Sequence, residues 1–425
     1  MSSLSEKDFQ FVWHPFTQMK TAQPPLPVVR AEGVWLFTED GKKYLDANSS
    51  WWTNINGHGN KYIADKIYEQ FLEIDHVIFA GVTHPKAVEL SERILKKTEN
   101  NFQKVFFSDN GSTSVEVALK MVYQYWYNLG QTKKRFLAIQ GAYHGDTFGA
   151  MSVGERGYFN KPFEHLFFDV DFIDFPTSEN GNELLKKLER LFSTSEFAGF
   201  IFEPLVQGAA GMRMYDESWL DNAISLAKKH NVLTIGDEVM TGFYRTGKFL
   251  ATNYLTQKPD IICLSKGLTG GVLPLGLTLA TQKIFDAFLH EETTRALLHG
   301  HSFTGNAIAC AAACASLDLL EEKETIQQVE MIASMHHQFV KDQKNNPAFK
   351  SINPKGTILS IELKTNKDSG YFTSVRDEAY NYFLSKGFII RPLGNVIFLN
   401  PPYCISEEEL QSLYQVILEF AEMKR

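Results

Sequence analysis

The sequence predicts an α/β fold in which a mostly parallel sheet is covered by helices, together with a smaller α+β domain. From about Ile63 to about Leu320, short apolar segments alternate with segments of helical periodicity. The apolar segments are continuous runs, as expected for strands that helices cover on both faces. The five strand candidates are Lys104–Phe107, Phe136–Ile139, Gly199–Phe202, Val232–Ile235 and Ile261–Leu264.

The two ends of the chain have a different pattern, which predicts the smaller domain. Near the N-terminus, Val34–Phe37 and Lys43–Leu45 flank a turn sequence and predict a hairpin. In the last hundred residues, helices alternate with two or three strands, and Gly394 with Asn395 predicts another hairpin turn. Ser406, which three glutamates follow, predicts the start of the last helix, because serine and a later glutamate can cap each other's backbone N–H groups.

These changes of pattern divide the chain into three parts. Residues 1–54 are expected to form an N-terminal arm that belongs to the small domain. Residues 55–324 should form the large domain, and residues 325–425 the C-terminal part of the small domain. A chain of 425 residues, 44% of them hydrophobic, is long enough for more than one such domain.

The composition limits the classes of partner. The net charge is −8 and no basic patch is present, so nucleic acid is not an expected partner. No apolar run is long enough to span a bilayer, and the polar, acidic N-terminus is unlike a signal peptide. The four cysteines form neither a CxxC pair nor a disulfide framework, which favours a reducing, cytoplasmic setting.

Three of the predicted strands end in polar residues. Glu203 follows the strand that ends at Phe202, and Asp237 and Lys266 each stand two residues after the end of the next two predicted strands along the chain. Ligands of open α/β sheets bind outside the carboxyl ends of the strands. The three positions together therefore predict one site.

Lys266 has the most specific context of the three. It stands between an apolar strand and a segment with Gly267, Gly270 and Gly271, which permit a close approach of the backbone to a ligand. A lysine in such a pocket can lose its proton and attack an aldehyde. The alternative is a surface lysine at the end of a strand.

Asp237 and a helix start supply what a pyridoxal phosphate (PLP) site needs. Asp237 lies 29 residues before Lys266, and a carboxylate can keep the pyridine nitrogen of PLP protonated. Gly111 and Ser112 open a helix whose first N–H groups suit a phosphate. Tyr143 follows another strand and could stack on a flat ring. The alternatives are helix N-caps for the first two features and a structural loop tyrosine for the third.

Other chemistries lack their motifs. Gly57-His58-Gly59 lacks the rest of a dinucleotide fingerprint, and no nucleophile elbow is present. His299 and His301 have no third ligand nearby, so no metal is expected. A nicotinamide dehydrogenase is disfavoured because the dinucleotide fingerprint is incomplete. A PLP-binding sensor without catalysis is disfavoured as well, because no basic DNA-binding domain accompanies the site.

The motifs, taken in order, resemble those of the class III (fold-type I) aminotransferases, which depend on PLP, over nearly the full length. The segments that carry this resemblance are Asp109–Met121, Tyr143–Val153, Gly236–Gly247, Pro259–Gly271 and His299–Cys310. The resemblance implies an α/β fold-type I transferase with a large PLP-binding domain and a smaller α+β domain.

Further segments are similar to the branch of this class that acts in biotin biosynthesis. They are Trp13–Thr17, Ser49–Trp52, Tyr143–Ser152, Glu203–Gly208, Gly211–Tyr215 and Ile390–Gly394. The resemblance implies transamination of 8-amino-7-oxononanoate to 7,8-diaminononanoate, with S-adenosyl-L-methionine as the expected donor. The alternatives are lysine as donor, or another class III activity on an ω-amino acid or a diamine.

The resemblance also implies roles for single residues. Lys266, Asp237 and Tyr143 would be catalytic: Lys266 would bond to the cofactor aldehyde, Asp237 would bind the pyridine nitrogen, and Tyr143 would lie on the ring. Gly111 and Ser112 would hold the phosphate.

Substrate would be bound by a second set of residues in this resemblance. Trp51 and Trp52 would form an apolar wall, and Arg391 would bind the carboxylate of the oxo acid through its planar guanidinium. Phe16 and Tyr143 would also contact substrate. Phe16 and Phe398 stand where the family usually has tyrosine, so polar recognition should differ at these two positions.

A homodimer with active sites at its interface is the expected assembly. In the family, the residues matching His301 and Ser302 reach the phosphate of the neighbouring subunit's cofactor, and the residue matching Gly300 touches substrate. Ser302 stands where threonine is more usual.

Overall fold

A seven-stranded sheet forms the centre of the molecule. The computed structural model describes residues 3–365 and 374–424. The strand order is β4-β12-β11-β10-β7-β5-β6, and β12 alone runs antiparallel to its neighbours β11 and β4, so the sheet is mostly parallel, as predicted. The strands are β4 (Lys104–Ser108), β5 (Arg135–Ile139), β6 (Val170–Ile173), β7 (Phe197–Phe202), β10 (Leu233–Asp237), β11 (Ile261–Leu264) and β12 (Gly276–Ala280).

Both faces of this sheet are buried, which confirms the interpretation of its continuous apolar runs. On β5, Phe136 and Ala138 pack in one core with helix α5 (Gly111–Asn128). Leu137 and Ile139 point to the other face and pack with helices α7 (Gly181–Phe192) and α8 (Glu217–Lys229). The side chains of a strand point alternately to opposite faces, so both sets must be apolar.

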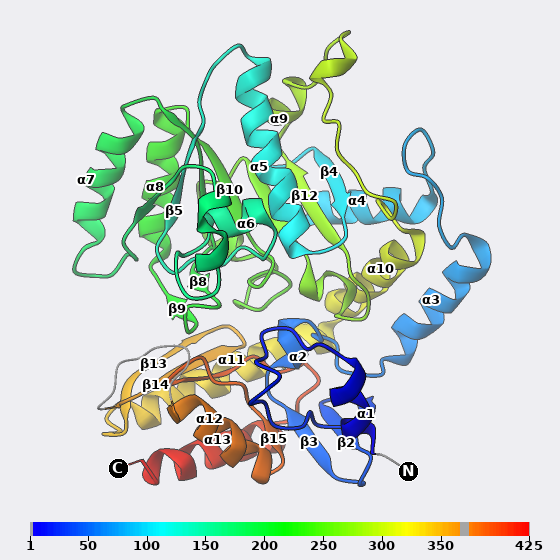
Figure 1. Ribbon diagram of the computed structural model, residues 1–425, viewed down its shortest axis with the longest axis vertical. Helices are drawn as coiled ribbons and strands as arrows, with labels where there is room; N and C mark the ends of the chain where they lie inside the picture. Colours follow the sequence, from blue (N-terminus) through cyan, green and yellow to red (C-terminus); the bar gives the residue numbers. More distant parts are fainter. Residues whose placement is uncertain (1–2, 366–373, 425) are drawn as a thin grey trace.

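The remaining elements of the large layer surround this sheet (Figure 1). They are α3 (Lys61–Glu73), α4 (Pro85–Lys97), α6 (Phe148–Val153), α9 (Gln282–Asp286), α10 (Ala307–Glu321), the 3-10 helices η1 (Lys161–Leu166), η2 (Ala251–Tyr254), η3 (Lys266–Thr269) and η4 (Thr293–Arg295), and the short hairpin β8 (Val206–Gln207) with β9 (Arg213–Met214).

The small layer is built from both ends of the chain and lies below the sheet in Figure 1. Strand β15 (Phe388–Ile389) adds in parallel to β3 (Lys43–Asp46), which is paired with β2 (Trp35–Thr38) and, beyond it, β1 (Val28–Glu32). This pairing confirms the predicted N-terminal hairpin. The other elements are α1 (Leu4–Phe11), α2 (Ser49–Trp52), α11 (Lys323–Gln343), α12 (Ser374–Ser385), α13 (Glu407–Glu422) and the sheet β13 (Phe349–Lys355), β14 (Ile358–Leu363) and β16 (Val396–Leu399).

Some expectations need correction. Asp237 is the last residue of β10 and does not follow it. The connection from Asp237 to Lys266 contains the short η2 where one strand-helix-strand step was expected. Strands β6 and β12 were not predicted; β12 opens with Gly276, where a Cβ atom would clash with the Asn110 carbonyl oxygen, so close packing explains its weak strand signal. The domain limits at 54 and 324 stay a prediction.

Two further properties concern the described part of the chain. Between residues 3 and 365 and between 374 and 424, no helix has both the length and the apolar character that a membrane crossing requires. Over the same residues, no group of three or more potential metal ligands is present.

Two capping boxes with a serine at the N-cap offer a matched test of stability. Ser406 caps α13, whose apolar face is buried, whereas Ser3 caps α1, which has no buried residue. We expect Ser406→Ala to lower the free energy of unfolding by about 1 kcal/mol, and Ser3→Ala to leave it nearly unchanged. Urea unfolding, followed by circular dichroism, measures both; equal shifts would contradict the argument.

Candidate active site

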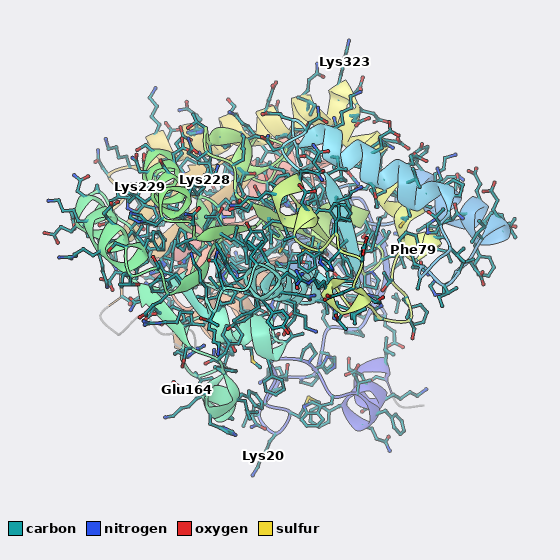
Figure 2. All side chains as sticks on the ribbon, turned by 90° about the horizontal axis from the view of Figure 1, so that it is seen from above. Lys20, Phe79, Glu164, Lys228, Lys229 and Lys323 are labelled. Atoms are coloured by element: carbon teal, nitrogen blue, oxygen red, sulfur yellow. The ribbon has the colours of Figure 1, made fainter. Side chains whose placement is uncertain are left out.

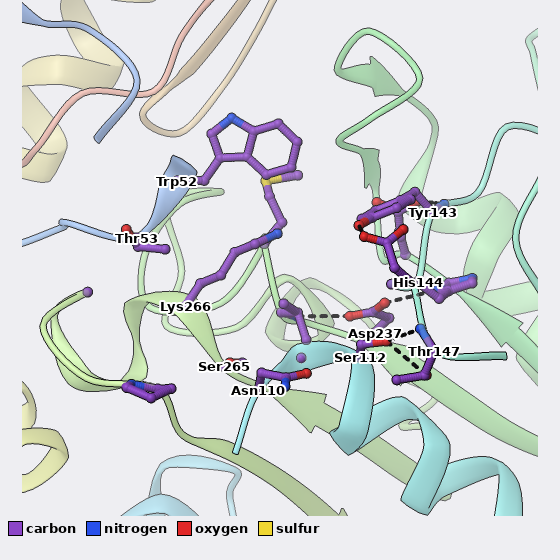
Figure 3. Close-up of a pocket in the computed structure, with 18 of the residues that line it drawn as sticks. Trp52, Thr53, Asn110, Ser112, Tyr143, His144, Thr147, Asp237, Ser265 and Lys266 are labelled. Carbon is purple, nitrogen blue, oxygen red and sulfur yellow. Dashed lines mark hydrogen bonds and ion pairs between the residues drawn. The ribbon is translucent and has the colours of Figure 1, made fainter. Parts of the chain in front are cut away.

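The carboxyl ends of β7, β10 and β11 open into a cavity of about 680 Å³. Glu203, Asp237 and Lys266 all line it, so the structure brings the three strand-end residues together. In Figure 3, Lys266 extends from one wall, and Asp237 and Tyr143 lie on the opposite wall. Other lining residues are Trp52, Thr53, Asn110, Gly111, Ser112, His144, Gly145, Asp146, Thr147, Val239, Met240, Ser265 and Gly271–Pro274.

Lys266 carries the amine of the site. It begins η3 with a φ of 45°, a left-handed conformation that is rare for a residue with a side chain. Its Nζ lies 4.5 Å from the ring centroid of Trp52. Burial lowers the pKa of Lys266 to about 8, against the opposing effect of Asp237 and Glu203. About a tenth of this amine is therefore neutral at pH 7, against well under 1% for a lysine with the ordinary pKa.

Asp237 is held by two donors from different segments. Its Oδ2 lies 2.7 Å from Nδ1 of His144, and its Oδ1 accepts the N–H of Val239 at 3.0 Å. His144 is buried, and no partner for its Nε2 is found in residues 3–365 and 374–424. Sequence reasoning assigned no role to His144, although it follows Tyr143 in the loop after β5. The pair keeps a carboxylate oriented at the cavity wall.

The start of α5 forms the second wall and is shaped for an anion. Asn110 accepts the N–H of Thr113 at 3.0 Å, while the N–H groups of Gly111 and Ser112 have no acceptor in the described chain. The Ser112 Oγ accepts the N–H of Thr147 at 2.9 Å, which fixes that hydroxyl at the cavity. A Cβ atom at Gly111 would lie 2.7 Å from Cγ1 of Val239, so only glycine allows this approach. Free N–H groups at a helix start attract phosphate.

Glu203 positions the Tyr143 loop. The Oε1 of Glu203 accepts the Tyr143 N–H at 3.1 Å, and Oε2 accepts the Gly208 N–H at 2.9 Å. Burial raises the pKa of Glu203 to about 7, with a further raising effect from Asp237 and an opposing one from His144. The Tyr143 hydroxyl donates to Oδ2 of Asp146 at 3.0 Å. Sequence reasoning placed Glu203 at a strand end but assigned it no role.

A second cavity of about 840 Å³ adjoins the first and is mainly apolar and aromatic. Trp52, Tyr143 and Lys266 line both cavities. The ring of Phe16 lies 5.4 Å from that of Trp51 and 5.9 Å from that of Phe159. The N-terminal arm thus lies against the segment before η1, and Figure 2 shows Lys20 and Glu164 at this same edge of the molecule.

Arg391 stands beside Trp51, one of the residues that line this cavity. Its guanidinium lies 5.1 Å from the Trp51 ring centroid. A small cavity of about 30 Å³ is lined by Arg391, Trp51, Trp52 and Phe398, among others. The Trp52 ring is 6.0 Å from that of Phe398 and nearly perpendicular to it. The structure therefore brings the expected substrate residues into one neighbourhood.

Gly300, His301 and Ser302 lie elsewhere in the single chain. They belong to the loop between η4 and α10 and line neither of the two cavities that Lys266 lines. The Ser302 carbonyl oxygen lies 2.6 Å from Nε2 of His76. Their expected role requires a second subunit and stays a prediction.

The comparisons with known proteins define the class. The family model for class III aminotransferases matches residues 16–420. The chain belongs to the class III aminotransferase family, and this confirms the resemblance inferred from the motifs.

Curated relatives narrow the comparison. The adenosylmethionine-8-amino-7-oxononanoate aminotransferase of Synechococcus elongatus is 43% identical over 416 residues, which cover 96% of this chain and 97% of the relative. The enzyme of the same name from Staphylococcus aureus is 36% identical and covers 97% of this chain and 96% of the relative.

Solved structures agree with the fold. The crystal structure of adenosylmethionine-8-amino-7-oxononanoate aminotransferase from Methanocaldococcus jannaschii has a TM-score of 0.93 and 35% identity, and covers 99% of this chain and 98% of that one. An amine transaminase from an uncultivated Pseudomonas species, solved in the PLP-bound form, has a TM-score of 0.89 and 28% identity, and covers 97% of this chain and 98% of that one.

The raised pKa of Glu203 gives a prediction for stability against pH. The folded protein holds this proton up to about pH 7, while an unfolded chain releases it near 4.5. Stability should therefore fall as pH rises through this window, by at most about 3 kcal/mol from this group. Glu203→Gln should remove that fall, as measured by urea midpoints at pH 5, 6 and 7.

A surface carboxylate provides the control for this experiment. Lys229 and His230 lower the pKa of the surface residue Glu189 through hydrogen bonds. The stability that this gives is lost only as pH falls below the ordinary value, so Glu189→Gln should leave the profile between pH 5 and 7 nearly unchanged. If Glu203→Gln and the natural protein had parallel profiles of stability against pH, the conclusion that folded Glu203 keeps its proton up to about pH 7 would be refuted.

Proposed function

We propose that this chain is the PLP-dependent aminotransferase that converts 8-amino-7-oxononanoate to 7,8-diaminononanoate in biotin biosynthesis, with S-adenosyl-L-methionine as amino donor. The observation that carries the proposal is the set of groups in one cavity. Lys266, Asp237 and the free N–H groups at the start of α5 face the same space. The sequence similarity to enzymes named for this substrate pair supports the choice of reaction.

The donor set of the cavity fits PLP. A primary amine with a lowered pKa suits the aldehyde, a held carboxylate suits a pyridine nitrogen, and the α5 start suits a phosphate. Tyr143 and Val239 both line the cavity and offer an aromatic and a branched apolar surface for a flat ring. When bound, PLP supplies an electron sink for the C–H bond next to nitrogen.

The residues of this chain perform the proton chemistry. The Nζ of Lys266 accepts the proton from the carbon beside the donor nitrogen. It returns a proton when the amine is passed on. The lowered pKa keeps part of this amine neutral and able to accept. Asp237, oriented by His144 and the Val239 N–H, holds a negative charge opposite a protonated ring nitrogen. Glu203 keeps the Tyr143 loop in place.

The aromatic cavity suits an acceptor with a long alkyl chain. Trp51, Trp52 and Phe16 supply apolar area next to Lys266, and Arg391 supplies a cation beside Trp51 for a terminal carboxylate. An acceptor with a ketone near one end and a carboxylate at the other matches these kinds of group. Phe16 and Phe398 keep the rings of the usual tyrosines and lack their hydroxyls.

A homodimer is the proposed assembly. The loop that carries Gly300, His301 and Ser302 is flanked by two exposed apolar side chains, Leu298 and Phe303. Both side chains would be removed from water if this loop lay in a subunit interface. In a dimer this loop could deliver His301 and Ser302 to the partner's phosphate site.

The pKa of Lys266 can be tested by cofactor capture. Only the neutral amine attacks an aldehyde, so the rate at which the apo-protein binds PLP should rise about tenfold per pH unit below about 8 and level off above it. The absorbance of the lysine-bound cofactor reports the rate. Lys266→Ala should show no such absorbance; normal capture by this variant would contradict the assignment.

The donor and the acceptor can be tested in separate half-reactions of the PLP-loaded protein. S-adenosyl-L-methionine should remove the absorbance of the lysine-bound cofactor, and 8-amino-7-oxononanoate should restore it. Arg391→Ala should raise the oxo-acid concentration for half-maximal rate about tenfold or more and leave the donor step unchanged. A response to lysine alone would reassign the donor, and no response to either would favour another ω-amino substrate.

A further inference from the structure

The turn that carries Trp51 and Trp52 has a disfavoured backbone. Ser49, Ser50 and Trp52 have φ values of 49°, 58° and 66°, in the left-handed region that favours glycine. Such a turn persists only when its surroundings hold it. The surroundings of this turn therefore determine where the two tryptophan rings stand.

One buried carboxylate holds the start of this turn. Asp46 ends β3 and accepts the N–H of Asn48 at 3.1 Å and the N–H of Ser50 at 2.6 Å. The Nε2 of His58 lies 2.9 Å from the same carboxylate. Asp46 is fully buried, so these bonds act in a low-dielectric region where they are strong.

Asn48 connects the turn to the segment of Arg391. Its side-chain Oδ1 accepts the backbone N–H of Arg391 at 2.8 Å, and its Nδ2 donates to the Phe398 carbonyl at 2.9 Å. The residue is buried at 1% exposure. An amide is the side-chain group that offers a donor and an acceptor in one fixed plane. Asn48 thus spans two backbone segments that flank the small cavity.

A parallel tie fixes β16 independently of Asn48. The Ser49 hydroxyl donates to the carbonyl of Asn400 at 2.8 Å, and the Asn400 N–H donates to the carbonyl of Ala47 at 2.9 Å. Arg391 lies between β15, which ends at Ile389, and the bridge from Leu393 to Val396, outside both pairings. The bond to Asn48 is therefore the tie that acts on the Arg391 backbone itself.

We propose that Asn48 is a positioning residue for the carboxylate anchor, and that it sets the substrate chain length by fixing Arg391 relative to Trp51 and Lys266. The inference rests on the proposed role of Arg391 and extends it. Asn48 is buried and both polar atoms of its amide are bonded to backbone groups, one of them the N–H of Arg391, so it acts through Arg391. A shift of the anchor by about 1 Å can reduce binding or rate severalfold or more.

The test uses nonanoate, a nine-carbon carboxylate that has the chain and the anion of the proposed acceptor but no reacting group. Its dissociation constant from the PLP-loaded protein is measured by calorimetry for the natural protein, Asn48→Ala, Arg391→Ala and the double variant. Asn48→Ala should weaken binding about tenfold, as expected when a hydrogen-bonded anchor is released. Heptanoate, which is two carbons shorter, should lose less affinity than nonanoate in Asn48→Ala, because a loosened anchor discriminates less between chain lengths.

Two controls separate positioning from loss of structure. Nonan-1-ol lacks the carboxylate, so its binding should be the same in Asn48→Ala as in the natural protein. Asn128→Ala removes another buried asparagine, whose Nδ2 donates to the carbonyls of Ala287 and Arg295 at 3.0 Å each, and should leave nonanoate binding unchanged.

The double variant decides the mechanism. If Asn48 acts through Arg391, the double variant should bind nonanoate within about twofold of Arg391→Ala alone. The inference would be overturned if the two substitutions multiplied each other's effect on the dissociation constant. It would also be overturned if Asn48→Ala bound nonanoate as tightly as the natural protein, or if the natural protein did not bind nonanoate. The proposed function is judged separately, by turnover of 8-amino-7-oxononanoate in the natural protein, so either can fail alone.

Discussion

The parallel register of β7, β10 and β11 is the constraint on which the site depends. Gly236 pairs with Phe202, and Asp237 pairs with Cys263, so the three strands end side by side. Glu203, Asp237 and Lys266 consequently leave the sheet at one edge, although 63 residues separate the first from the last. A slip of one residue in this register would turn the strand-end side chains to the opposite faces of the sheet.

Burial of these groups sets their chemistry. Removal from water disfavours every charge, so the pKa of Lys266 falls to about 8 and that of Glu203 rises to about 7. The opposite charges offset part of this effect, since Asp237 and Glu203 raise the pKa of Lys266. The two carboxyl groups differ in their partners: Asp237 faces the imidazole of His144, whereas Glu203 accepts the backbone N–H groups of Tyr143 and Gly208. One is suited to hold charge at the cavity, and the other to hold a loop.

The sequence predicted much of the fold and of the site because these parts leave local signals. Apolar runs of strand length gave five central strands, and a lysine or a carboxylate at a strand end gave Lys266 and Asp237. The contact between His144 and Asp237 joins residues 93 positions apart, and that between Asn48 and Arg391 joins residues 343 positions apart. Such pairings depend on how layers pack, and no periodicity or spacing encodes them. Strand β12 escaped prediction because Gly276 serves a close backbone contact and weakens the strand pattern.

Phe398 contributes both its backbone and its ring to contacts near Trp52 and Arg391. Its carbonyl oxygen accepts the bond from Asn48, its backbone pairs with Ser360 in the sheet, and its ring meets the ring of Trp52 edge to face. The first two contacts use the backbone, which phenylalanine and tyrosine share. The bond to Asn48 and the pairing in the sheet are therefore independent of a ring hydroxyl, and a change between tyrosine and phenylalanine alters what the ring offers to its neighbours and to a bound molecule. Substrate preference can thus change at this position while the anchor and the tryptophan wall keep their places.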